Sequence, residues 1–315
     1  MTETLGKIHS YRAWEKAHRI VESTGPEGEP TVKFAYRACE TIEEVPAVIT
    51  ALPASFNPLT IAHVELLEAA AEKKRPTESI LILDKRAMDK KLYGATLEDR
   101  LLMLELFAAQ RMGTSVAFSS HGLFLDKALA LRKVYPHGSE LYFVVGFDTI
   151  VRLFDPRYYE DRDDALDSLF SMSHFLVGNR GGEDEVSVQN LLNIPRNRKY
   201  AGYIETIRIS PRAAAISSTE IREKKERNEE LGSTAPHVIV RFIDETALFR
   251  PPKASEPDGT GIRPDRYQTR CNIMGLLNSA GLPEQEDMHV GRMVNAVMKG
   301  EKPMEVVKRF LTGLH

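Results

Sequence analysis

Residues 54–63, which read Ala-Ser-Phe-Asn-Pro-Leu-Thr-Ile-Ala-His, form a tight turn that leads directly from a β-rich run into a predicted helix. Such a turn presents backbone N–H groups and the positive end of the helix dipole, and both attract phosphate. Thr60 and His63 are three residues apart, so they lie on one helical face and can point at the same anion. The alternative is that Asn57 and Pro58 only cap the helix and that His63 is a half-buried surface histidine.

A second candidate anion site lies at residues 216–222, which read Ile-Ser-Ser-Thr-Glu-Ile-Arg. Three successive hydroxyl residues at a helix start form an anion nest, and Arg222 follows Ser218 by one turn on the same face. This combination suits a polyphosphate. The alternative is an ordinary helix start, because Ser217 and Glu220 fit the S-x-x-E capping box. One helix start that is suited to phosphate is common. Two such phosphate-type helix starts in one chain, each at the carboxyl end of a predicted core strand, are much rarer.

Several other kinds of site have no counterpart in the sequence. It contains no G-x-x-x-x-G-K-[ST] loop, no G-x-G-x-x-G after the first core strand, no H-E-x-x-H and no zinc-type Cys/His spacing. P-loop ATPases and ordinary dehydrogenases are therefore unlikely matches. Only two cysteines occur, Cys39 and Cys271, which are too few for a disulfide framework.

The composition is that of an ordinary globular protein. The 315 residues are 42% apolar and 28% charged, and the net charge of −3 is spread without a strong block of either sign. We therefore expect no nucleic-acid partner and no anionic membrane surface as a partner. No apolar run approaches the roughly 20 residues of a membrane span, and no signal-like segment begins the sequence. A cytoplasmic location is the expectation.

Short β-rich runs alternate with helical periods from about residue 45, which predicts an α/β fold with helices crossing over a mostly parallel, doubly wound, Rossmann-like sheet. The predicted strands are Val45–Leu52, Ser79–Asp84, Ser115–Ser119, Leu141–Gly146, His174–Gly178 and Tyr203–Ile209. The predicted crossover helices are Thr60–Arg75, Thr96–Gln110 and Leu123–Val134. An open sheet of this kind places its ligand crevice at the carboxyl ends of the strands, which is where both candidate anion sites fall.

The chain divides into four parts by composition. Residues 1–44 form an N-terminal extension with a helix at Tyr11–Val21, residues 45–250 form the α/β core, and residues 251–266 are a Pro/Gly-rich linker. Residues 267–315 form a C-terminal helical segment. Its apolar spacing predicts three short amphipathic helices, broken at residues 281–283 and 300–303. This segment is too small to fold alone, so we expect it to dock on its own core or to join two copies in a homo-oligomer.

The two motifs together resemble a known family. Ser55-Phe56-Asn57-Pro58 with Thr60-x-x-His63, followed by Ile216-Ser217-Ser218-Thr219-x-x-Arg222, is similar to the paired motifs of the nucleotidyltransferase superfamily that carries the (H/T)-x-G-H signature. Within it the chain most resembles the nicotinamide or nicotinate mononucleotide adenylyltransferases. Three stretches between the motifs support this: Gly146-Phe147-Asp148 with Pro156 and Tyr159, residues 89–94 with Arg100, and Val177-Gly178-Asn179-Arg180-Gly181-Gly182.

The resemblance implies adenylyl transfer from ATP to nicotinamide or nicotinate mononucleotide, with Mg²⁺ held mainly by the substrate phosphates. It assigns catalytic roles to His63, Thr60, Arg222, Lys90 and Lys91. The implied ATP-binding residues are Ser55, Phe56, His63, Gly146, Asp148, Arg180, Ser217, Ser218, Thr219 and Arg222. The implied mononucleotide-binding residues are Asn57 and Tyr159, the latter as a stacking surface for the pyridine ring. Individually, Asp148 could instead cap a helix, Tyr159 could be a core residue, and Lys90 and Lys91 could be a solvated pair.

The sequence departs from the family pattern at three positions. Ala54 stands where the first motif of the family begins with Gly, Ala62 replaces the Gly of the signature, and Tyr159 stands where a Trp is expected. Two alternatives remain open for this reason. One is a different reaction within the superfamily, phosphopantetheine adenylyl transfer or cytidylyl transfer. The other is a nucleotide-binding regulator without turnover.

Overall fold

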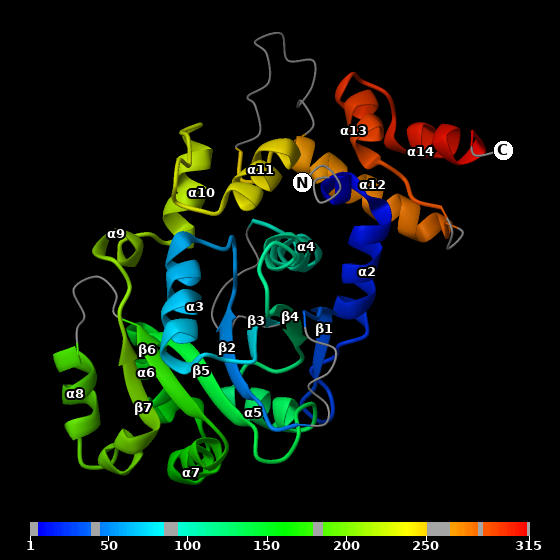
Figure 1. Ribbon diagram of the computed structural model, residues 1–315. Coiled ribbons are helices and arrows are strands. Elements are labelled where there is room, and N and C mark those ends of the chain that lie inside the picture. Colours follow the sequence, from blue (N-terminus) through cyan, green and yellow to red (C-terminus); the bar gives the residue numbers. More distant parts are fainter. Residues whose placement is uncertain are drawn as a thin grey trace.

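The computed structural model describes residues 6–38, 45–84, 94–178, 185–250, 265–282 and 286–313. These form a seven-stranded sheet with helices on both faces (Figure 1). The strands are β1 (Val32–Tyr36), β2 (Val48–Ala54), β3 (Glu78–Asp84), β4 (Thr114–Ser119), β5 (Glu140–Gly146), β6 (His174–Gly178) and β7 (Ile204–Ile207). The α-helices are α2 (Tyr11–Glu22), α3 (Ile61–Lys74), α4 (Leu97–Ala108), α5 (Phe124–Arg132), α6 (Phe147–Leu153), α7 (Arg162–Met172), α8 (Glu185–Asn193), α9 (Pro211–Ala214), α10 (Ser218–Glu226), α11 (His237–Thr246), α12 (Arg266–Ala280), α13 (Val290–Met298) and α14 (Pro303–Thr312). Short 3₁₀ turns are η1 (Lys7–His9), η2 (Pro156–Tyr158) and η3 (Arg198–Tyr203).

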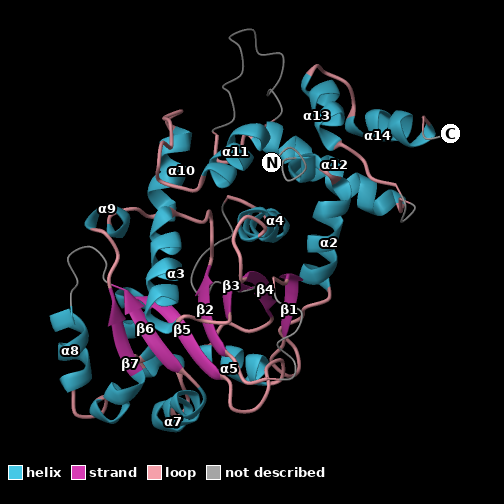
Figure 2. Cartoon of the chain, in the orientation of Figure 1, coloured by secondary structure: helices cyan, strands magenta, loops and turns pink. Residues whose placement is uncertain are grey.

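The strand order is β1-β4-β3-β2-β5-β6-β7, and every pair except β1 with β4 is parallel. Starting at β2, the chain adds β3 and β4 toward one edge of the sheet and then β5, β6 and β7 toward the other edge. The order of the strands therefore reverses between β2 and β5 (Figure 2). Such a reversal leaves a crevice outside the carboxyl ends of the two central strands. The predicted α/β doubly wound fold is confirmed.

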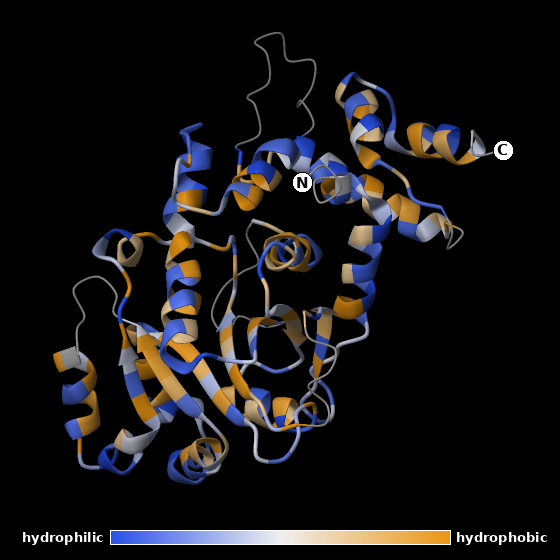
Figure 3. Cartoon of the chain, viewed as in Figure 1, coloured by the Kyte–Doolittle hydropathy of each residue, from blue (hydrophilic) through white to orange (hydrophobic). Residues whose placement is uncertain are grey.

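Alternate strand residues face two separate apolar layers, as the pleat requires. In β3, Leu81 and Leu83 pack toward α3 and α4, whereas Ile80 and Ile82 pack with the residues of α5, α6 and α7 on the other face. All four side chains are fully buried. The apolar strands between amphipathic helices are visible in the hydropathy colouring (Figure 3), and they explain why continuous apolar runs marked these strands in the sequence.

Two features of the sheet differ from expectation. Strand β1 was not predicted, because Val32–Tyr36 follows a Gly/Pro/Glu-rich break and gains its strand conformation by antiparallel pairing with β4. Thus the N-terminal extension contributes a strand to the sheet. The predicted strand Tyr203–Ile209 is shorter, since Tyr203 ends the turn η3 and only Ile204–Ile207 pair with β6.

The three predicted C-terminal helices are present as α12, α13 and α14. They form a third apolar cluster with the N-terminal helix, in which Tyr11 and Trp14 of α2 meet Ile273 and Leu277 of α12 and Met293 of α13. Figure 1 shows these helices grouped beyond α4, on the same side of the molecule as the N-terminus. The C-terminal segment therefore packs on its own chain. Residues 251–264, most of the predicted linker, lie outside the described residues.

Candidate active site

The first motif turns the chain from β2 into α3 and fixes the histidine ring. Thr60 is the N-cap of α3, and its backbone N–H donates to His63 Nδ1 over 3.1 Å. The Thr60 hydroxyl lies 2.9 Å from the same nitrogen. Because Nδ1 accepts from the backbone, a neutral His63 ring carries its proton on Nε2. The predicted helix cap is therefore present, and the same contacts fix the orientation of the His63 ring.

The second motif lies directly against the first. The Ser218 hydroxyl donates to the Pro58 carbonyl over 2.8 Å, and Arg222 Nη1 donates to the Asn57 carbonyl over 2.8 Å. Arg222 Nη2 also donates to Thr219 Oγ1 over 3.0 Å. Ser217 caps α10 by accepting from the Glu220 backbone N–H. Two helix N-termini separated by some 160 residues of sequence thus open onto one place.

A cavity of about 490 Å³ lies at this junction, at the carboxyl ends of β2 and β5. Its size is within the usual range for small-molecule sites. The predicted site residues that line it are Ser55, Asn57, Thr60, His63, Gly146, Asp148, Tyr159, Ser217, Ser218, Thr219 and Arg222. Phe56 is buried behind the wall, with its ring centroid 5.1 Å from that of His63. Lys90, Lys91 and Arg180 lie outside the described residues.

The charge of the cavity wall is strongly unbalanced. Among the described lining residues, three arginines and His63 face a single carboxylate, that of Asp148. Asp148 is in the first turn of α6, directly after Gly146 ends β5. A wall with this excess of positive charge suits a polyanion.

Residues 51–224, more than half of the chain, match the cytidylyltransferase-like family. The chain belongs to this family. A putative nicotinamide mononucleotide adenylyltransferase of Schizosaccharomyces pombe is 31% identical over 146 residues, which cover 45% of this chain and 57% of that protein. A probable nicotinate-nucleotide adenylyltransferase of Lachnoclostridium phytofermentans is 26% identical over 202 residues, which cover 62% of this chain and 95% of that protein.

Among solved structures, a Plasmodium falciparum nicotinic acid mononucleotide adenylyltransferase complexed with NaAD aligns with a TM-score of 0.49 and 18% identity, over 64% of this chain and 96% of that chain. The family match confirms the predicted nucleotidyltransferase superfamily and with it the enzyme class. None of the described helices of this family member has the length and apolar character needed to span a membrane.

Two arginines of this cytidylyltransferase-like protein were not predicted as site residues. Arg100 on α4 is almost fully buried and donates to the carbonyls of Ala95 (2.9 Å) and Ser55 (3.3 Å). Burial lowers the pKa of Arg100 to about 10, with a smaller contribution in the same direction from Arg222; the guanidinium stays charged at neutral pH. Arg152 on α6 also lines the cavity. A single arginine inside a helix belongs to no recognisable sequence motif, so neither residue stands out as a site residue in the sequence. The one local signal is that Arg152 follows Asp148 by one helical turn.

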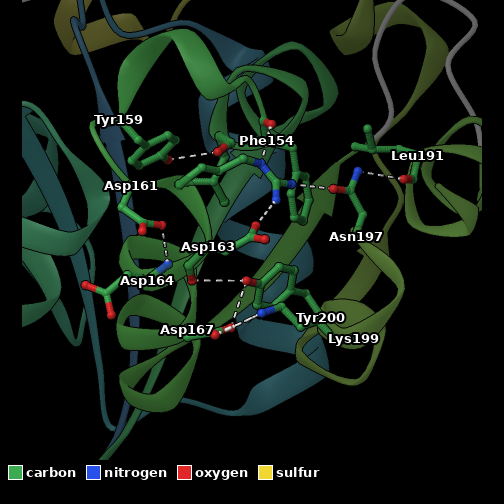
Figure 4. A network of polar contacts seen from close by, with 12 residues as sticks. Phe154, Tyr159, Asp161, Asp163, Asp164, Asp167, Leu191, Asn197, Lys199 and Tyr200 are labelled. Atoms are coloured by element: carbon green, nitrogen blue, oxygen red, sulfur yellow. Dashed lines mark hydrogen bonds and ion pairs between the residues drawn. The ribbon is translucent and has the colours of Figure 1, made fainter. Parts of the chain in front are cut away.

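Tyr159 forms part of the cavity wall beyond α6, and Figure 4 shows its hydroxyl bonded near a network of polar contacts in the same loop region. Its hydroxyl donates to the Leu153 carbonyl over 2.8 Å, and burial raises its pKa to about 12, so the ring is neutral. Arg162 is buried beneath this loop and donates to the Phe154 carbonyl over 2.9 Å and to Asn197 Oδ1. Tyr159 therefore combines the core packing of the alternative interpretation with a face on the cavity.

Proposed function

We propose that this protein transfers the adenylyl group of ATP to the phosphate of nicotinamide or nicotinate mononucleotide and releases pyrophosphate. The observation that carries the proposal is the meeting of two phosphate-type helix starts at one cavity, through the Arg222–Asn57 and Ser218–Pro58 hydrogen bonds. The names of the relatives support the choice of reaction and acceptor.

In this reaction an oxygen of the acceptor phosphate forms a bond to the α-phosphorus of ATP. The bond from that phosphorus to the bridging oxygen breaks, and pyrophosphate leaves with the electron pair. Because the acceptor phosphate is already anionic, no protein nucleophile and no general base are needed. The work of the protein is to hold two polyanions in line and to stabilise the charge that develops on the leaving group.

We assign the residues of the cavity to these tasks. His63 donates its Nε2–H to the ATP phosphates, a role for which its Nδ1 contact with Thr60 prepares the ring. The backbone at Ser217–Thr219 and the guanidinium of Arg222 hold the β and γ phosphates. Asp148 accepts from the hydroxyls of the ribose, and Tyr159 stacks against the pyridine of the acceptor, with Asn57 beside it. From the family resemblance alone we assign Lys90 and Lys91 to the approaching phosphates and Arg180 to the adenosine.

The donor set fits a magnesium ion carried by the substrate. Mg²⁺ binds through few carboxylates and several phosphate oxygens and waters, and Asp148 is the one carboxylate among the described lining residues. No cluster of three metal-ligating side chains occurs in the described parts of the chain. When bound, the ion neutralises charge on the triphosphate.

The test is to incubate the protein with ATP, Mg²⁺ and a panel of phosphorylated acceptors and to measure pyrophosphate. The panel contains nicotinamide mononucleotide, nicotinate mononucleotide, phosphopantetheine and phosphocholine, and a parallel series replaces ATP with CTP. We expect pyrophosphate with ATP and one or both pyridine mononucleotides, and its loss in His63→Ala. Pyrophosphate only with another acceptor or only with CTP would identify a different reaction of the superfamily. Nucleotide binding without any product would favour a regulator.

A further inference from the structure

The C-terminal helix α12 reaches the first turn of α4 through a buried polar cluster. Arg270 is 1% exposed and its Nη1 lies 2.7 Å from both carboxylate oxygens of Asp99. Its Nη2 donates to the Ile8 carbonyl over 3.1 Å, so the guanidinium also ties down the N-terminal extension. Asp99 is completely buried. A buried charge pair with this many partners fixes the position of α12 on α4.

Tyr267 extends this cluster to the backbone at the start of α4. Its hydroxyl donates to Asp99 Oδ2 over 2.8 Å and accepts from the Thr96 backbone N–H over 2.9 Å. Thr96 is the N-cap of α4, and its side chain accepts from the Asp99 backbone. One phenolic oxygen from the far end of the sequence therefore occupies a position where the start of this helix needs an acceptor.

The residues next to Thr96 contact two residues of the cavity wall, Asn57 and Arg100. The Ala95 backbone N–H donates to Asn57 Oδ1 over 3.2 Å, and the Ala95 carbonyl accepts from Arg100. Gly94 has a φ of +106° and packs so closely on the Asn57 amide that an added Cβ would lie 2.8 Å from its oxygen. The Asn57 carbonyl in turn accepts from Arg222. Hydrogen bonds, joined by short stretches of covalent chain, thus link α12 to Arg222 through Thr96, Ala95 and Asn57.

We propose that Tyr267 is a positioning residue for the active site, through which the docked C-terminal segment sets the place of Asn57, Arg100 and Arg222. The inference rests on the proposed function. It assigns a catalytic consequence to a segment outside residues 51–224, the part of the chain that matches the family. Without the phenolic oxygen, Thr96 N–H loses its acceptor and the turn at residues 94–96 is free to shift relative to the cavity.

The test is Tyr267→Phe, which removes the hydroxyl and keeps the ring, with Tyr11→Phe as the matched control. Tyr11 is buried between the two ends of the chain, and its hydroxyl donates to Asn278 Oδ1 of α12 over 3.4 Å. Both variants lose one hydroxyl from the same docked region. Of these two hydroxyls, that of Tyr267 bonds to the backbone at the start of α4, next to the residue that contacts Asn57.

We expect Tyr267→Phe to lower kcat/KM for ATP about ten-fold or more, the scale of a small misplacement of positioned groups, at a temperature where circular dichroism shows it folded. Its dissociation constant for the methylene analogue of ATP should rise about five-fold or more, while Tyr11→Phe stays within about two-fold of wild type in both. A purely structural role would lower the melting temperature and leave these constants unchanged. That outcome, or a Tyr267→Phe protein that does not fold, would overturn the proposal.

The binding measurement separates this inference from the proposed reaction. If wild type binds the ATP analogue but releases no pyrophosphate with any acceptor, the proposed function fails, and the ratio of the two variants' dissociation constants still decides the role of Tyr267. Equal constants for the two variants would then overturn it. If wild type does not bind the analogue, both proposals are wrong.

Discussion

Two aspartates, one at the contact between α12 and α4 and one at the carboxyl end of β3, are held in very different ways. Asp99 receives two hydrogen bonds from Arg270 and one from Tyr267. Asp84, at the carboxyl end of β3, lies 3.1 Å from the ammonium of Lys127, which also donates to the carbonyls of His121 and Gly122. Burial raises the pKa of Asp84 to about 6, against a smaller opposing effect of Lys127.

The comparison shows how this chain distributes its polar interactions. At the contact between α12 and α4 the Asp99 carboxylate is paired with Arg270 inside the protein, so changes there should act mainly on stability. At the carboxyl edge of the sheet the described lining residues carry positive charge in excess of negative charge, so changes there should act mainly on ligand binding. Tyr267 is the exception that links the two regions.

The largest effect should come from Arg270→Met, which leaves Asp99 buried without its counter-charge. We expect the free energy of unfolding to fall by about 3–5 kcal/mol. The control is Arg250→Met, because Arg250 forms a half-exposed pair with Asp244 that is worth at most about 1 kcal/mol. Urea unfolding followed by circular dichroism measures both. Equal losses of unfolding free energy in the two variants would contradict the expectation that the contact between α12 and α4 matters mainly for stability.

His63→Ala should act on activity instead. Removing one preorganised donor costs about 2–4 kcal/mol of transition-state stabilisation, or roughly 10²–10³-fold in kcat, while loss of its part in the helix cap costs about 1 kcal/mol of stability. His174→Ala is the control, since His174 begins β6 at the opposite end of the strands. Pyrophosphate release measures the effect. Turnover within a few-fold of wild type in folded His63→Ala would remove His63 from the mechanism.

Arg222→Ala should raise KM for ATP about ten-fold and leave KM for the mononucleotide nearly unchanged, because charge-assisted hydrogen bonds contribute about 1.5–3 kcal/mol. Arg227→Ala on the exposed end of the same helix region, where Arg227 pairs with Glu229, is the control. Steady-state kinetics with each substrate varied in turn measures the split. A change in the mononucleotide constant alone would place Arg222 on the other substrate.

The last prediction concerns pH. A carboxyl whose pKa is raised to about 6 on folding binds more protons in the folded state, so it makes stability fall as pH rises from about 4 to 6, by at most about 1.4 kcal/mol per pH unit. Asp84→Asn should remove this fall. The measurement is the unfolding free energy at pH 4, 5, 6 and 7 for both proteins. Parallel curves would show that Asp84 titrates alike in both states.

Much of the core could be predicted because its signals are local. The parallel strands are buried on both faces and read as continuous apolar runs, and both phosphate-type helix starts carry their polar residues within a few positions of each other. The motifs thus identified the two sequences that meet, although their contact through Ser218 and Pro58 is visible only in three dimensions.

The interactions that escaped prediction join residues far apart in sequence. Strand β1 depends on its partner β4, and Tyr267 and Asp99 are 168 residues apart. Neither has a local pattern, since an isolated tyrosine at a helix start is ordinary. Arg100 was noted only as the end of a family-like stretch, and its burial against Ser55 follows from how α4 enters the cavity wall.

The contact between the two ends of the chain has a consequence for synthesis on the ribosome. Tyr11 and Trp14 are covered by α12 and α13, and Ser10 donates to Asp287, 277 residues later. At about 5–20 residues per second, the first helix keeps its apolar face uncovered for tens of seconds until the last helices emerge. Trp14 is the sole tryptophan of the sequence, so intrinsic fluorescence during refolding should report the moment when the chain closes on itself.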